Sequence, residues 1–372
     1  MKILQLTAHF YPNIGGVETH LSDLVESLRK RNFNVTILTY QPLTTKVKWK
    51  IFEKGKNLYL YRIPWISGLF YKLVNKPALE FLYLLPGLFL FTPIMILANN
   101  PEVIHAHGLV AGFVGVFWGK VFNKKVVVST HSIYKFPKKG LYRKLVVWVF
   151  KQSNCVMGLS NQAAQEIKAL GVDSAKVLVF TYWVDLDKFK ILTNSKKKLG
   201  LEKKFVALFV GRLIAEKGIK ELLDAAEKWD DRIKLLIAGS GPLMELVKSF
   251  EVKKVNIKFL GKIEQKDLPI YYNAADVLIV PSVHEEGFGR VILESLACGT
   301  PVVGAKRGAI PEAMDNTVGR IIKISTTTIK NTVEYFLYNP EQLRKLQKNT
   351  RKFAERRYSE KNIETIISAY QR

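Results

Sequence analysis

Short apolar runs alternate with amphipathic stretches along almost the whole chain. Before residue 186 these runs predict strands at 2–7, 34–40, 58–63, 102–107, 125–130, 155–160 and 176–180. Later in the chain they predict strands at 204–211, 233–239, 256–261, 276–282, 300–305 and 318–324. Several runs are apolar at almost every position, which is typical of parallel strands that helices cover on both faces. The alternation therefore predicts an α/β protein built on parallel sheets.

The alternation lapses in the polar, lysine-rich residues 186–204, and this lapse predicts a linker between two doubly wound domains. We expect a Rossmann-like N-terminal domain at 1–190, a second one at 191–350, and a C-terminal helix at 351–372 that packs back on the first domain. Doubly wound sheets bind ligands beyond the carboxyl ends of their strands. Two such domains facing each other predict a site in the cleft between them.

The segment 81–101 contains no charged residue and is long enough to cross a bilayer. Pro86 and Pro93 lie inside it, and no basic residues flank it directly, so the sequence disfavours a membrane-spanning helix. We expect a buried or interfacial helix instead. The sequence leaves open whether this helix touches lipid.

Three glycine-marked turns lie between a predicted strand and a helix, at Gly15-Gly16, at Gly239-Ser240-Gly241-Pro242 and at Gly287-Phe288-Gly289. Glycine allows close backbone approach, and the free amides of a helix start attract anions, so a phosphate could bind at any of them. Each turn could equally be only a turn or a helix cap. The sequence contains neither GxGxxG nor a Walker motif, which argues against a dinucleotide or P-loop site.

Two cations and two carboxylates follow strands of the second half. Arg212 and Lys217 could together hold a diphosphate. The Arg212 guanidinium would make two parallel hydrogen bonds and the Lys217 ammonium would act as a point charge, although Arg212 could instead pair with Glu216. Glu286 and Glu294 lie before and inside a predicted helix, where carboxylates can accept hydrogen bonds from sugar hydroxyls. Alternatively, Glu286 could be a solvated acid of the loop, and Glu294 could be favoured at its position by the helix dipole.

Histidines occupy the carboxyl ends of two predicted strands, at His105 and His107 and at His131. No third ligand at a familiar spacing accompanies the histidine pair, so we expect no metal site. The histidines are better candidates for hydrogen-bond donors to a substrate or for proton carriers. The pair Asp185 and Asp187 could hold a divalent ion, but its place at the linker favours a local cap.

Taken in order, these motifs resemble the retaining glycosyltransferases of family 4, which have the GT-B fold. The resemblance spans essentially the whole chain and rests on GGVE (15–18), IHAHG (104–108), THS (130–132), GRLIAEKG (211–218), GSGP (239–242) and PSVHEEGFGRVILESLACGTPVV (281–303). It implies transfer of a sugar from a nucleotide-diphosphate sugar with retention at the anomeric carbon. It also implies that no cofactor and no metal ion is needed.

The resemblance implies a role for each matching residue. Arg212 and Lys217 would hold the donor diphosphate, Glu294 would bond the ribose, Glu286 would bond the donor sugar, and His131 would lie near its reacting face. Further donor contacts would come from the turns, at Gly15, Gly16, Gly241, Phe288 and Gly289, whereas His105 and His107 would lie on the acceptor side. The family commonly has an asparagine in the segment that matches residues 181–185, and its absence here puts the interdomain hinge in doubt.

The net charge of +25 is uneven, since residues 1–190 carry 25 basic and 10 acidic side chains and residues 191–372 carry 32 and 22. Residues 103–165 contain no acidic residue, and lysines alternate there with aromatic residues. Such a mixture suits an anionic membrane surface or a single-stranded nucleic acid, although the aromatic residues could also be buried beneath a merely basic surface.

We expect a cytoplasmic enzyme, peripheral on the inner face of the membrane, that acts on a lipid or lipid-linked acceptor and binds no nucleic acid. One alternative is a soluble glycosyltransferase that acts on a free sugar or sugar phosphate. Another is a non-enzymatic protein that binds polyanions on a GT-B scaffold.

Overall fold

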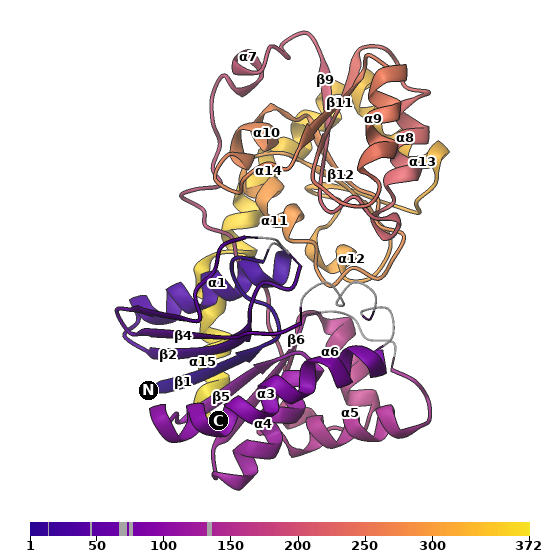
Figure 1. Cartoon of the computed structure of the whole chain (residues 1–372). Coiled ribbons are helices and arrows are strands. Elements are labelled where there is room, and N and C mark those ends of the chain that lie inside the picture. Colours follow the sequence, from indigo (N-terminus) through magenta and orange to yellow (C-terminus); the bar gives the residue numbers. More distant parts are fainter. Residues whose placement is uncertain (14, 45–46, 67–72, 74–76, 132–135) are drawn as a thin grey trace. The chain divides into compact units, whose positions relative to one another are not determined.

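The computed structural model describes residues 1–372 except 14, 45–46, 67–72, 74–76 and 132–135. The chain divides into two compact units (Figure 1). Unit 1 consists of Met1–Thr181 and Asn362–Arg372, and unit 2 consists of Tyr182–Lys361. Each unit is an α/β layer structure, so the prediction of two doubly wound domains is confirmed.

Unit 1 contains an eight-stranded sheet in the order β3-β4-β2-β1-β5-β6-β7-β8. Only the edge pair β3–β4 is antiparallel among the pairings that the structure describes. The strands are β1 (Lys2–Thr7), β2 (Asn34–Tyr40), β3 (Phe52–Gly55), β4 (Leu58–Ile63), β5 (Val103–His107), β6 (Lys125–Thr130), β7 (Cys155–Gly158) and β8 (Val177–Val179).

Helices cover both faces of this sheet. They are α1 (Gly16–Lys30), α3 (Pro77–Asn99), α4 (Leu109–Val121), α5 (Leu141–Gln152), α6 (Asn161–Ala169) and α15 (Ile363–Gln371). Helices α3, α4 and α5 enclose an apolar core that includes Leu4 and Ile104 (Figure 1). The neighbouring side chains Gln5 and His105 point to the opposite face, as successive residues of a strand must, and there they meet Tyr370 of α15.

Unit 2 contains a six-stranded parallel sheet in the order β11-β10-β9-β12-β13-β14. The strands are β9 (Phe205–Val210), β10 (Ile233–Ala238), β11 (Ile257–Gly261), β12 (Val277–Val280), β13 (Val302–Ala305) and β14 (Gly319–Ile322). The helices are α7 (Ser195–Lys198), α8 (Ile219–Ala226), α9 (Met244–Lys253), α10 (Leu268–Ala274), α11 (Arg290–Ala297), α12 (Ile310–Ala313), α13 (Thr326–Tyr338) and α14 (Pro340–Arg357).

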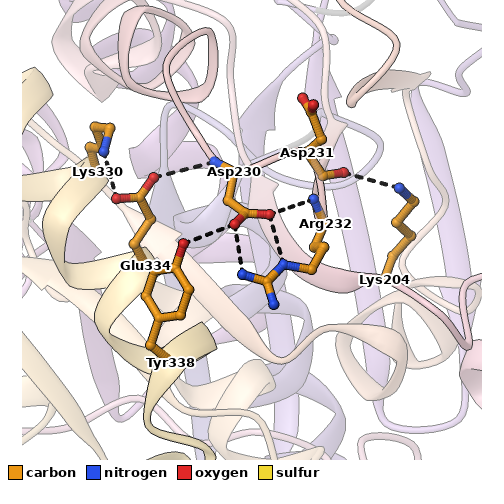
Figure 2. A network of polar contacts seen from close by, with 7 residues as sticks. All are labelled: Lys204, Asp230, Asp231, Arg232, Lys330, Glu334 and Tyr338. Carbon is orange, nitrogen blue, oxygen red and sulfur yellow. Dashed lines mark hydrogen bonds and ion pairs between the residues drawn. The ribbon is translucent and has the colours of Figure 1, made fainter.

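A polar network fastens α13 to the turn before β10 (Figure 2). The Tyr338 hydroxyl donates to Asp230 at 2.9 Å, and the Asp230 amide donates to Glu334 at 3.2 Å. Arg232 also bonds Asp230, with 2.7 Å between Nη2 and Oδ2. The network lies at the surface, so it orients α13 but contributes little net stability.

Three expectations from the sequence need correction. Strand β3 was not predicted from the sequence, because its residues Phe52–Gly55 are all exposed and carry no alternating apolar signal. Residues 186–204 are not a free linker, because Phe189 is fully buried and Lys196 pairs with Asp276 at 2.6 Å within unit 2. The C-terminal helix predicted at 351–372 is two helices, since α14 belongs to unit 2 and only α15 returns to unit 1.

Candidate functional site

Each sheet contains one place where neighbouring strands send the chain in opposite directions. In unit 2, β9 leads through α8 to β10 on one side, whereas β12 leads through α11 to β13 on the other. In doubly wound sheets, ligands bind at such a switch point, at the carboxyl edge of the sheet. The loops after β9 and β12 carry Arg212, Lys217 and Glu286, so the structure places three of the predicted residues at this switch point.

Glycine geometry brings the two loops into contact. Gly218 has φ +68°, and a Cβ built on it would lie 1.9 Å from the carbonyl oxygen of Pro281. Beside it, the Val283 amide donates to the carbonyl of Glu216 at 3.0 Å. On the other side, a Cβ on Gly308 would lie 2.5 Å from the backbone of Glu286. Residues without a side chain are thus needed on both sides of the loop that carries Glu286.

The site centres on an ion pair between Lys217 and Glu286. The Lys217 Nζ lies 2.5 and 2.6 Å from the two carboxylate oxygens of Glu286, and the Ser282 hydroxyl donates to the same carboxylate at 2.9 Å. Burial opposes the charge on Glu286, but the ammonium and the hydrogen bonds outweigh it and lower the pKa of the carboxyl group. Glu286 is therefore ionised and fixed in orientation, and neither it nor Lys217 is a freely solvated side chain.

Arg212 is an exposed cation on the loop that also carries Lys217. Within the part of the chain that the structure describes, its guanidinium has no ion-pair partner, so the alternative of a pair with Glu216 is wrong. Its loop is held by the turn after β10, where a Cβ on Gly241 would lie 2.5 Å from the carbonyl oxygen of Leu213. Gly241 thus has a packing role. Its contact with the nucleotide-sugar donor stays a prediction.

Glu294 lies deeper, on the second turn of α11. Its side chain is almost fully buried, accepts a 2.8 Å hydrogen bond from the Tyr272 hydroxyl, and pairs with Arg290 at 3.3 Å. Burial raises the pKa of Glu294, and the charge of Arg290 and the hydrogen bonds offset this only in part. The ribose contact of Glu294 stays a prediction.

The start of α11 presents backbone rather than side chains. Gly289 is the N-cap of the helix, with φ +72°, and because it has no side chain it makes no side-chain cap hydrogen bond. The Phe288 ring is buried and contacts the rings of Tyr182 and Tyr358 edge-on, so Phe288 can contribute to a ligand site only through its backbone amide.

Unit 1 has a second switch point, between β1 and β5. Gly15 and Gly16 lie at the start of α1, which follows β1. The Glu18 carboxylate folds back over this turn, because a Cβ on Gly15 would lie 2.3 Å from its oxygen. His107 ends β5, and His131 follows the neighbouring strand β6.

The three predicted histidines lie together in unit 1. His107 Nδ1 is 3.0 Å from His131 Nε2, and the rings of His105 and His107 have centroids 4.1 Å apart. Burial lowers the pKa of His105 and of His131 to about 3, and burial together with the neighbouring histidines lowers the pKa of His107 well below its ordinary value. All three are therefore neutral, which suits hydrogen bonding better than proton uptake.

Among the described residues, no group of three His, Cys, Asp or Glu side chains could hold a metal ion. The Asp185 carboxylate accepts hydrogen bonds from the amides of Asp187 and Lys188, both at 3.0 Å. It therefore caps local structure, as expected from the sequence.

Replacing Gly218 by alanine is expected to lower the stability of unit 2 by about 2–3 kcal/mol, because the new methyl group collides with the Pro281 carbonyl and φ becomes strained. Chemical denaturation of the whole protein measures this change. Gly200→Ala is the matched control, since Gly200 also has a positive φ but has no atom near its Cβ position. Equal losses in both variants would contradict the proposed loop contact.

Comparison with known families decides the assignment. The family described as Glycosyl transferases group 1 matches residues 192–353, and that described as Glycosyltransferase Family 4 matches residues 14–188. The chain belongs to glycosyltransferase family 4. This family 4 glycosyltransferase is 26% identical over 348 residues to an uncharacterized glycosyltransferase of Methanocaldococcus jannaschii, covering 86% of this chain and 84% of the relative. It is 23% identical over 332 residues to the GPI3 subunit of phosphatidylinositol N-acetylglucosaminyltransferase from Saccharomyces cerevisiae, covering 85% of this chain and 70% of the relative.

Solved structures share the fold of this family 4 glycosyltransferase. Sucrose-phosphate synthase of Thermosynechococcus elongatus superposes with a TM-score of 0.84 at 21% identity, covering 100% of this chain and 98% of that chain. Anabaena HepE, solved in complex with UDP-glucose, gives a TM-score of 0.76 at 18% identity, covering 100% and 98%. The protein therefore has the GT-B fold.

The side chains that hold the site residues of this family 4 glycosyltransferase in place were not predicted from the sequence. Ser282 and Tyr272 bond Glu286 and Glu294, and Tyr370 bonds His105. Ser282 could have been found, because it lies in the same motif as Glu286. Nothing in the local sequence around Tyr272 or Tyr370 marks them, since their partners are distant in the chain.

Proposed function

We propose that the protein is a retaining glycosyltransferase that moves a sugar from a nucleotide-diphosphate sugar to a lipid or lipid-linked acceptor at the cytoplasmic face of a membrane. The observation that carries this proposal is the Lys217–Glu286 pair, a cation and an ionised carboxylate held side by side at a switch point. The relatives agree with both substrates, because HepE is solved with UDP-glucose and the GPI3 enzyme is named for phosphatidylinositol.

In this proposal the diphosphate binds at the carboxyl edge of the unit 2 sheet. Arg212 is exposed there and can pair with two phosphate oxygens, while Lys217 adds a point charge. The free amides at the start of α11, after Phe288 and Gly289, add hydrogen bonds and the positive end of the helix dipole. These groups stabilise the charge that develops on the diphosphate as it leaves the sugar.

The carboxylate of Glu286 is proposed to accept hydrogen bonds from hydroxyl groups of the donor sugar, and His131 to bond the sugar from unit 1. No carboxylate is assigned as a nucleophile, so the retained configuration is proposed to arise from departure and attack on the same face. The proposal includes no cofactor and no metal ion, because the two cations supply the positive charge.

Arg212→Ala is expected to weaken binding of a nucleoside diphosphate on the order of 10- to 100-fold, because a hydrogen bond between charged groups is lost. Titration calorimetry with UDP and GDP measures the affinity. Arg232→Ala is the control, since Arg232 is an exposed arginine of the same unit that is engaged with Asp230. Unchanged affinity in Arg212→Ala would overturn the donor site. If the unaltered protein binds neither UDP nor GDP, nucleotides with other bases are screened next.

The acceptor half of the proposal rests on α3. Of the described residues, Ala78–Asn99 form the one helix that is long and apolar enough to cross a membrane. One side of α3 packs into the core of unit 1, while the other side exposes a stripe of large apolar side chains. The stripe consists of Leu79, Leu82, Leu90, Phe91, Ile94 and Leu97, which are 40–71% exposed. At 1.5 Å per residue it is about 27 Å long.

Contacts with the sheet fix α3 on the surface of unit 1. The Tyr40 hydroxyl, from β2, donates to the Leu84 carbonyl and accepts from the Leu88 amide at 3.0 Å. A Cβ on Gly87 would lie 2.6 Å from the Tyr40 ring, so helix and strand are in close contact. We therefore propose that α3 lies in the membrane interface along its exposed stripe and does not span the bilayer.

Basic residues adjoin the stripe. Lys124 donates to Asn100, just after α3, at 2.7 Å, and the exposed Lys120 belongs to α4, which packs on α3 through Trp118 and Phe89. Burial raises the pKa of Glu80, the acid in the first turn of α3, to about 7, which limits its negative charge near neutral pH. Lysines beside an apolar stripe fit the anionic lipids of a cytoplasmic leaflet.

Sedimentation with vesicles of anionic and of neutral phospholipid tests the acceptor half. We expect binding to the anionic vesicles at low salt that weakens as salt rises. A protein that ignores anionic vesicles at low salt would favour the soluble alternative, an enzyme that acts on a free sugar or sugar phosphate. That outcome would leave the donor site standing, since the Arg212 experiment tests it separately.

A further inference from the structure

A continuous row of hydrogen bonds crosses the face of the unit 1 sheet that α15 covers. His131 bonds His107 at 3.0 Å, and His107 Nε2 bonds the Gln5 side-chain oxygen at 2.6 Å. The Gln5 amide nitrogen lies 3.3 Å from the Tyr370 hydroxyl, which also lies 2.7 Å from His105 Nδ1. The row thus joins His131, which follows β6, to Tyr370 in the last turn of α15.

The polarity of the Gln5 amide sets the direction of every bond between it and His131. The amide oxygen can only accept, so the proton of His107 must be on Nε2. A neutral His107 then has a bare Nδ1, and this nitrogen must accept a hydrogen bond from His131 Nε2. His131 is therefore protonated on Nε2, and its Nδ1 is an acceptor. Burial keeps these histidines neutral by lowering their pKa values.

Tyr370 holds the amide in this orientation. A phenol is a better donor than acceptor and imidazole nitrogen is a good acceptor, so the 2.7 Å contact is the hydroxyl donating to His105 Nδ1. His105 Nε2 then donates to the Ser129 hydroxyl, also at 2.7 Å. With its proton used in this way, the Tyr370 oxygen can only accept from Gln5, which turns the amide nitrogen toward α15 and the amide oxygen toward His107.

Without the hydroxyl the Gln5 amide could reverse. A reversed amide donates to His107 Nε2, which moves the proton of His107 to Nδ1 and makes His131 Nε2 an acceptor. His131 would then be protonated on Nδ1. The two tautomers of His131 present opposite hydrogen-bonding characters at that nitrogen.

We propose that Tyr370 is a positioning residue that fixes His131 in the tautomer protonated on Nε2. The tautomer follows from the contacts within unit 1 alone. Its consequence for turnover rests on the proposed function, in which His131 bonds the donor sugar.

Long-range proton–nitrogen NMR of the full chain with labelled histidine tests the tautomer directly, because the two ring nitrogens resonate differently in each form. The His131 signal is assigned by its loss in His131→Asn. We expect the unaltered protein to show the form protonated on Nε2, and Tyr370→Phe to lower the ratio of the two forms on the order of fivefold to tenfold. An unchanged His131 signal in Tyr370→Phe would overturn the inference.

Tyr40→Phe is the matched control, because it removes another buried hydroxyl of unit 1 that bonds only α3 backbone among the contacts described. It should leave the His131 signal unchanged, and a similar change in both variants would also overturn the inference. Gln5→Leu removes the polar link between Tyr370 and His107. Adding Tyr370→Phe to Gln5→Leu should then change the His131 signal no further.

Kinetics separate this inference from the proposed function. If His131 bonds the sugar, Tyr370→Phe should lower kcat several-fold with little change in the KM for the donor. A tautomer change without any change in turnover upholds the inference and contradicts the assigned role of His131. A change in turnover with an unchanged tautomer contradicts the inference.

Discussion

Lys217→Ala is expected to lower kcat/KM for the nucleotide-sugar donor on the order of 100- to 1,000-fold. The substitution removes one of the two cations proposed to stabilise the leaving diphosphate. It also frees the Glu286 carboxylate, which Lys217 holds through bonds to both oxygens at 2.5 and 2.6 Å. Nucleotide release in the presence of a lipid extract measures the rate. Lys220→Ala is the control, because Lys220 is an exposed lysine three residues further along the same segment.

The same variant should change how stability depends on pH. In the unaltered protein the pKa of Glu286 is lowered, so this acid stabilises the fold above its unfolded pKa and loses that contribution as pH falls through the folded pKa. Without Lys217 burial dominates and the pKa rises above its ordinary value. The acid then destabilises the fold at neutral pH, by about 2–3 kcal/mol, and the loss recovers as the pH is lowered to about 5.

Thermal unfolding between acid and neutral pH measures this reversal. The double variant Lys217→Ala, Glu286→Gln should recover stability at neutral pH, because the unpaired charge is gone, but its kcat/KM should stay as low as that of Lys217→Ala or fall further. If Lys217→Ala alone were as stable as the unaltered protein at neutral pH and less stable in acid, the ion pair would not govern Glu286.

The strands could be predicted because each is a local signal. The run KVVVST (125–130) has three successive valines, which is typical of a strand covered on both faces. β3 lacks this signal, since its residues Phe52–Gly55 are exposed and held only by pairing with β4. Residues 186–204 look like a linker because they are rich in lysine, yet Phe189 buries its ring in unit 2. One buried aromatic residue outweighs a polar composition.

The site could be predicted as a set of residues but not as a set of contacts. Motifs marked Lys217 and Glu286 separately, whereas their pairing depends on how Gly218 and Gly308 let three loops touch. The histidines were recognised as strand ends, but their hydrogen-bond partner Tyr370 lies 265 residues from His105. Sequence spacing cannot reveal a contact between groups so far apart when each is locally unremarkable.

The double variant Leu82→Glu, Leu90→Glu is expected to weaken binding to anionic vesicles by at least about 100-fold. Both side chains are 64% exposed on the α3 stripe, so the fold tolerates the change. Each substitution removes an apolar side chain from the lipid interface and adds a charge that the anionic surface repels. Sedimentation at low salt measures the partition coefficient, and circular dichroism checks that the helix content is retained.

Val252→Glu, Val255→Glu is the matched control, because it adds the same charge at valines that are 89% and 92% exposed in unit 2. If the charge of the whole protein drove vesicle binding, both double variants would weaken it equally, and the role of the stripe would be contradicted. If the stripe is the docking surface, only the α3 variant detaches. Its kcat/KM should then fall for a lipid acceptor presented in vesicles while its affinity for the nucleotide stays unchanged, because Arg212 and Lys217 belong to unit 2 and the stripe to unit 1.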